Sequence, residues 1–140
     1  MKKTTLEVVE AIQKSARHLP EVRVIAKMEI GEVVRQGDIY IERVKEIEGK
    51  GKAIKSRQLA PGTSKGSRHI VDESPKVKLW ESKPTLNSKA GFQVGPAIEA
   101  EGDFSVSHPE HAFVKFVVKA TRFFQVWFQA DFARKERAKD

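Results

Sequence analysis

The sequence predicts a mainly β fold: a single-domain β-sandwich or distorted β-barrel, cupin-like in its barrel form, with one N-terminal α-helix. Polar and apolar residues alternate along most of the chain, which is the pattern of half-buried strands. Turn residues separate roughly eight or nine such segments at about ten-residue spacing, as in sandwiches and small barrels. Helical periodicity is confined to residues 1–20.

The chain is expected to form one domain in three parts. Its 140 residues are enough for a single hydrophobic core. Residues 1–20 are the predicted helix, 21–132 the β-rich body and 133–140 a charged tail in a frayed helical turn. At the start of the helix, Thr4 and Glu7 have the spacing of a capping box.

Alternation of polar and apolar residues gives the predicted strands. They lie over residues 22–26, 39–44, 69–72, 77–80, 97–100, 104–107, 112–118 and 122–132. The predicted turns and loops between them include residues 48–52, 60–68 and 81–91. In the last strand, Phe124 and Val126 share the face that we expect to be core. Phe123 and Trp127 share the opposite face, which is a candidate contact between subunits of a homo-oligomer.

Composition excludes several classes of protein. No apolar run is long enough to span a membrane, and the N-terminus has no secretion signal. The chain has no cysteine, which excludes disulfides, thiol catalysis and thiolate metal sites. We therefore expect a cytoplasmic protein that does not bind membranes.

The net charge of +7 is unevenly distributed along the chain. Residues 50–68 contain six basic residues and no acid, whereas residues 90–114 contain four acids and no lysine or arginine. The two stretches are expected to be solvated or to attract each other across the fold. The alternative is that the basic stretch binds an acidic or phosphate-bearing partner.

Three of the four histidines suggest a site. His69 follows the glycine-rich loop, and His108 and His111 flank Pro109. Three imidazoles are a facial ligand set for a divalent metal such as Zn, Mn, Ni or Fe in cupin-type barrels, and Glu110 could act there as acid and base. The alternative is that His108 and His111 are turn residues hydrogen-bonded to the backbone.

The glycine-rich loop over residues 60–68 is a second candidate site. It lacks the spacing of a nucleotide-binding phosphate loop, and the serines lack the sequence context of a catalytic nucleophile. Its backbone amides, with Lys65 and Arg68, could still bind an anion beside His69 and Glu110. A basic nucleic-acid-binding surface made of Arg57, Lys65, Arg68 and Trp80, with Phe92 as an alternative ring for stacking a base, is a further alternative.

The sequence resembles a group of small bacterial and phage-associated β-rich proteins for which no activity is known. The resemblance rests on four stretches: GDIYIERV (37–44), QLAPGTSKGSRHIV (58–71), GPAIEAEGDFSVSHPEH (95–111) and FFQVWFQADFARKERA (123–138). It implies a β-rich fold with a histidine-bearing face. Many members have a second histidine where this chain has Ser67, which puts a metal site that needs both in doubt.

These observations favour a non-enzymatic binding or accessory module whose working face is built from residues 61–69 and 108–111. A cupin-like metal-binding protein or metal-dependent enzyme is the second hypothesis. A nucleic-acid-binding module is the third.

Overall fold

The computed structural model describes residues 22–60, 69–85, 89–131 and 136–137. This part of the chain contains strands and no α-helix, which confirms the mainly β class. The strands form two sheets, and neither sheet closes on itself, so the prediction of a barrel, cupin-like or distorted, is wrong. The predicted N-terminal helix lies outside the described residues.

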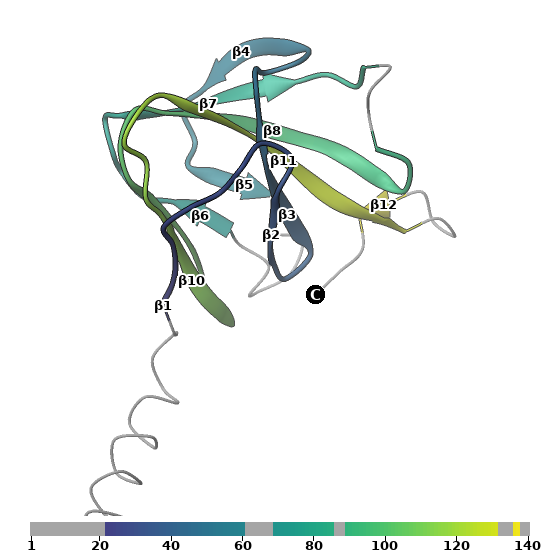
Figure 1. Cartoon of the computed structure of the whole chain (residues 1–140). Coiled ribbons are helices and arrows are strands. Elements are labelled where there is room, and N and C mark those ends of the chain that lie inside the picture. Colours follow the sequence, from purple (N-terminus) through teal and green to yellow (C-terminus); the bar gives the residue numbers. More distant parts are fainter. Residues whose placement is uncertain (1–21, 61–68, 86–88, 132–135, 138–140) are drawn as a thin grey trace, which may run out of the picture.

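The two sheets form two layers, which can be followed in Figure 1. The five-stranded sheet has the order β1 (Val22–Ile25), β10 (His111–Phe116), β9 (Phe104–His108), β6 (His69–Val71) and β5 (Gln58–Ala60). The seven-stranded sheet has the order β2 (Val33–Gln36), β3 (Ile39–Val44), β11 (Arg122–Asp131), β8 (Phe92–Ala100), β7 (Val77–Ser82) and β4 (Lys50–Ile54), and β12 (Glu136–Arg137) pairs with the end of β11. Strand β1 runs parallel to β10, and the other paired strands are antiparallel.

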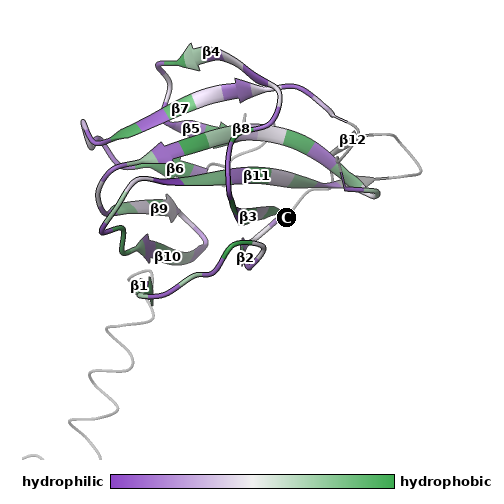
Figure 2. Cartoon of the chain, turned by 45° about the horizontal axis from the view of Figure 1, so that its top comes forward, coloured by the Kyte–Doolittle hydropathy of each residue, from purple (hydrophilic) through white to green (hydrophobic). Residues whose placement is uncertain are grey.

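The core lies between the two sheets, where alternate residues of each strand point inward. Its centre is a cluster of three phenylalanines, Phe104 and Phe116 from the five-stranded sheet and Phe124 from the seven-stranded sheet, each at most 1% exposed. The ring centroids lie 4.7 Å apart for Phe104 and Phe116, and 5.4 Å from each of these to Phe124. Figure 2 shows the alternation of hydrophobic and hydrophilic residues along β8 and β11 that this packing requires.

Several strands differ from the prediction. Strand β2 was not expected, and β4 begins where a flexible turn was predicted over residues 48–52. Gly49 precedes β4, and Gly51 lies within it where the register with β7 shifts, which is a position that suits glycine in a strand. Residues 136–137 form β12 because β11 offers them a free edge, so a helical turn is wrong for those two residues.

Strand β8 begins at Phe92, five residues before the strand predicted over residues 97–100, and it contains a β-bulge. Trp127 of β11 faces Val94 and Gln125 faces Ala97, so two residues of β8, Gly95 and Pro96, stand opposite one residue of β11. A Cβ atom at Gly95 would lie 2.9 Å from both the Phe128 ring and the Val126 carbonyl oxygen, so glycine is required for this close approach.

The side chain of Gln125 stabilises the bulge. Its amide Nε2 donates hydrogen bonds to the carbonyl oxygens of Gly95 at 2.8 Å, Val126 at 3.0 Å and Pro96 at 3.3 Å. Carbonyl groups that the bulge removes from the regular ladder are thereby satisfied.

No helix long and apolar enough to cross a membrane occurs in the part of the chain that the structure describes.

Replacing Phe124 with alanine is expected to lower the free energy of unfolding by about 3–5 kcal/mol, because the cavity would open at the contact between the sheets. Urea unfolding measures the change. The matched control is Phe123→Ala, which removes the half-buried ring of the preceding residue on the outer face. It should lower the free energy of unfolding by about 1 kcal/mol. Equal losses in the two variants would contradict this assignment of the faces.

Candidate functional site

His69 lies at the contact between the two sheets. It is the first residue of β6, and its side chain is fully buried. Its ring nitrogens contact the hairpin of β2 and β3: Nδ1 lies 2.8 Å from Gln36 Oε1, and Nε2 lies 2.9 Å from Asp38 Oδ1. Gln36 and Asp38 are each 3% exposed. The predicted site histidine is therefore held by two buried polar side chains.

The orientation of Gln36 determines the hydrogens on His69. Gln36 Nε2 donates to the carbonyl oxygens of Val106 at 3.0 Å and Ala112 at 2.8 Å. Its Oε1 atom must then accept from His69 Nδ1, and His69 Nε2 faces Asp38 Oδ1. Both ring nitrogens of His69 are therefore used to bind the hairpin.

The structure brings the three predicted site histidines together. The ring centroid of His108 lies 4.5 Å from that of His69 and 4.4 Å from that of His111. His69 and His111 are nearly parallel, with 6° between the ring planes and 6.4 Å between centroids. His108 is buried, and its Nδ1 accepts a hydrogen bond from the backbone N–H of Glu110 at 3.0 Å, which closes the turn between β9 and β10.

The described residues contain no group of three or more His, Cys, Asp or Glu side chains arranged to hold a metal ion. His69 would have to exchange its bond to Gln36 or to Asp38 for a bond to the metal. Glu110 is exposed in the β9–β10 turn. The metal site at His69, His108 and His111 stays a prediction that this geometry does not favour.

Two residues of the predicted nucleic-acid surface, Arg57 and Trp80, have protein partners in the structure. The half-buried Arg57 guanidinium donates to the carbonyl oxygens of Val77 at 2.7 Å and Ser74 at 3.0 Å. The Trp80 ring lies under the Lys50 ammonium, 3.8 Å from the ring centroid. The two remaining residues of that set, Lys65 and Arg68, lie outside the described residues.

Lys50 also forms an ion pair with Glu99, with 3.6 Å between Nζ and Oε1. This pair joins the basic stretch of residues 50–68 to the acidic stretch of residues 90–114. The expected attraction between the two stretches is therefore present at this one described contact, on the outer face of the seven-stranded sheet.

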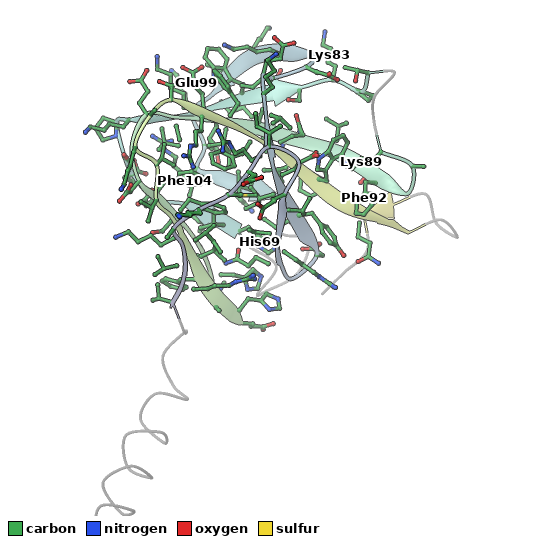
Figure 3. All side chains as sticks on the ribbon, in the orientation of Figure 1. His69, Lys83, Lys89, Phe92, Glu99 and Phe104 are labelled. Carbon is green, nitrogen blue, oxygen red and sulfur yellow. The ribbon has the colours of Figure 1, made fainter. Side chains whose placement is uncertain are left out.

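A different surface, absent from the sequence-based expectations, combines aromatic rings with cations. We call it the aromatic groove: a cavity of about 450 Å³ on the outer face of the seven-stranded sheet, lined by Val33, Arg35, Tyr40, Lys89, Phe92 and Trp127. The strand register places these residues together, because Tyr40 pairs with both Arg35 and Trp127 across β2, β3 and β11. Figure 3 labels Lys89 and Phe92 beside β8 and β11, apart from His69 in the lower part of the view.

The rings of the groove meet edge to face, and a cation lies near two of them. The centroids of Tyr40 and Phe92 are 5.1 Å apart with 81° between the ring planes. The Arg35 guanidinium carbon lies 5.3 Å from the centre of the Tyr40 ring, and Lys89 Nζ lies 6.0 Å from the Trp127 ring. These distances are within the range of cation–π attraction.

The polar side chains beneath the groove already have protein partners. Trp127 Nε1 donates to Glu42 Oε1 at 3.0 Å, and the other oxygen of Glu42 lies 3.4 Å from Lys89 Nζ. These contacts hold Trp127 in place, 7% exposed on what would otherwise be an open sheet face. A second cavity of about 360 Å³ adjoins the groove and shares Lys89 and Trp127 with it.

One signal in the sequence pointed to this surface. The alternation in β11 predicted an outer face for Phe123 and Trp127, as a subunit contact. The sequence offered Phe92 only as an alternative to Trp80 for stacking a base. Its place beside Trp127 follows from the bulge at Gly95 and Pro96, which sets it on that same face against the alternation of the rest of β8.

The chain belongs to the protein family defined by a domain of unknown function (DUF8820), whose model matches residues 35–117. The matched region contains His69, His108 and most residues that line the aromatic groove. No match was found among curated proteins or solved structures.

Replacing Asp38 with alanine is expected to lower the free energy of unfolding by about 3–5 kcal/mol, because it leaves the buried His69 ring without its anionic partner. Chemical unfolding of the purified variant measures this. Asp72→Ala removes an exposed carboxylate just after β6 and should change stability by less than about 0.5 kcal/mol. A variant at Asp38 as stable as the one at Asp72 would show that the pair is not structural.

Proposed function

We propose that this member of the DUF8820 family is a non-enzymatic binding module that holds its ligand in the aromatic groove. The observation that carries the proposal is the combination of a concave surface of about 450 Å³ with three aromatic side chains and two cations. Aromatic side chains, with a few polar groups that fix orientation, are typical of binding sites. The four strands β2, β3, β8 and β11 supply five of the six lining residues, so the site stands on a rigid support.

The chemistry of the lining residues supports binding rather than catalysis. Among the residues that the structure describes, the side chains that line the groove include no carboxylate, imidazole, hydroxymethyl or thiol group. The nearby carboxylate of Glu42 is engaged by Trp127 and Lys89. A general acid–base pair or an activated nucleophile is therefore not offered to a ligand in this groove.

In this proposal the histidine cluster positions the site. His69 holds Gln36 and Asp38, and these two residues occupy the hairpin that carries Arg35 and Tyr40 into the groove. The predicted working face of residues 61–69 and 108–111 stays a prediction, and with it the ligand contacts of Lys65, Arg68 and Glu110. The contacts of the described residues favour the groove over that face.

The two tryptophans allow a direct test, because each gives one indole N–H signal in a ¹⁵N NMR spectrum and Trp→Phe variants assign them. We would titrate the protein with three probes: oligothymidine, polyglutamate and cellohexaose. The proposal expects at least one probe to shift the Trp127 signal more than the Trp80 signal, which lies elsewhere on the sheet under Lys50. If none of the probes moves the Trp127 signal, the groove is not a binding site for these classes and the proposal fails.

A further inference from the structure

Resting on the proposed function, we infer that the ligand of the aromatic groove is single-stranded nucleic acid. Bases stack on the rings of Tyr40 and Phe92, and the adjoining phosphates contact Arg35 and Lys89. This site differs from the set predicted from the sequence, since it contains neither Arg57 nor Trp80.

The angle between the two rings favours a single strand over a duplex. The planes of Tyr40 and Phe92 are 81° apart, so two bases stacked on these rings cannot stay stacked on each other. A single strand tolerates such unstacking, whereas a duplex keeps its bases inside the helix. Stacking on rings does not depend on base identity, because every base has a π-face, so we expect little sequence preference.

Arg35 and Lys89 both keep N–H groups that can bind a phosphate. Among the described residues, the only hydrogen bond of the Arg35 guanidinium runs from Nε to Gly37 O at 2.7 Å, which leaves its two terminal amino groups for a phosphate. The Lys89 side chain is 43% exposed, and its pairing distance to Glu42 of 3.4 Å leaves ammonium hydrogens for a second acceptor. The net charge of +7 on the chain adds long-range attraction for a polyanion.

The same contacts disfavour other ligand classes. A neutral sugar also stacks on rings and can accept hydrogen bonds from Arg35 and Lys89, but it brings no negative charge to these two cations. An acidic peptide would use Arg35 and Lys89 but would leave the rings without a stacking partner. Single-stranded nucleic acid uses both kinds of group.

The experiment measures the affinity of the full chain for fluorescently labelled oligothymidine by anisotropy, with the matching duplex and polyglutamate as competitors. We expect unlabelled oligothymidine to displace the labelled strand, and the duplex and polyglutamate to displace it only weakly. The logarithm of the binding constant should fall linearly with the logarithm of salt concentration, by about 0.7 for each phosphate contact.

Variants locate the site. Phe92→Leu keeps an apolar side chain but removes the ring, and Arg35→Gln removes a cation from an exposed side chain without opening the core. Each is expected to weaken oligothymidine binding by about tenfold or more, and Arg35→Gln should also reduce the salt slope by about 0.7. The matched controls, Phe113→Leu and Lys115→Gln on the outer face of the five-stranded sheet, should leave affinity unchanged.

The outcomes separate the two proposals. Oligothymidine binding lost in the groove variants and kept in the controls supports both. If polyglutamate or cellohexaose shifts the Trp127 indole signal and oligothymidine does not bind, the nucleic-acid inference is overturned while the binding module stands. Oligothymidine binding that is equal in all four variants also overturns it, because the strand then binds elsewhere. If no probe reaches Trp127, both fail.

Discussion

Three buried polar side chains, Gln36, His69 and Asp38, join the two sheets at the end where the β2–β3 hairpin meets β6. Buried polar groups left unsatisfied cost about 1–3 kcal/mol each, so an incomplete version of this link would be worse than an apolar contact. Here it is complete, since Gln36 also bonds the carbonyl oxygens of Val106 and Ala112. The position of the hairpin relative to the five-stranded sheet depends on these bonds.

The hairpin therefore has two faces with separate duties. Residues that point inward, Gln36, Ile39 and Ile41, are buried and connect the sheets. Their outward neighbours, Arg35 and Tyr40, line the aromatic groove. Because side chains alternate along a strand, a change at one position can alter stability with little effect on the groove, and a change at the next can do the reverse.

Local periodicity allowed the sequence to predict the mainly β class and most strands of the described chain. The sequence could not predict whether a sheet closes into a barrel, because closure depends on which distant edge strands pair. The grouping of His69, His108 and His111 was expected, but the partners of His69 lie 33 and 31 residues away in the chain, so its structural bonds had no local signal. The groove was missed because Lys89 comes from a loop and Phe92 lies beyond a bulge.

The bulge at Gly95 and Pro96 changes which residues of β8 lie on the inner face of the sheet. After the bulge these are the even-numbered residues, such as Ile98 and Ala100. Before it Gln93 is on the inner face, and Phe92 and Val94 are on the outer face. A homologous chain that is one residue shorter here would lose the bulge, yet it would keep Ile98 and Ala100 inside and Phe92 and Val94 outside, because the rest of the register with β11 stays the same. Straightening the bulge without shortening the chain would instead turn Gln93 outward in place of Phe92 and Val94. The extra residue is therefore what lets this length of β8 present two apolar side chains to the outer surface over an unchanged core.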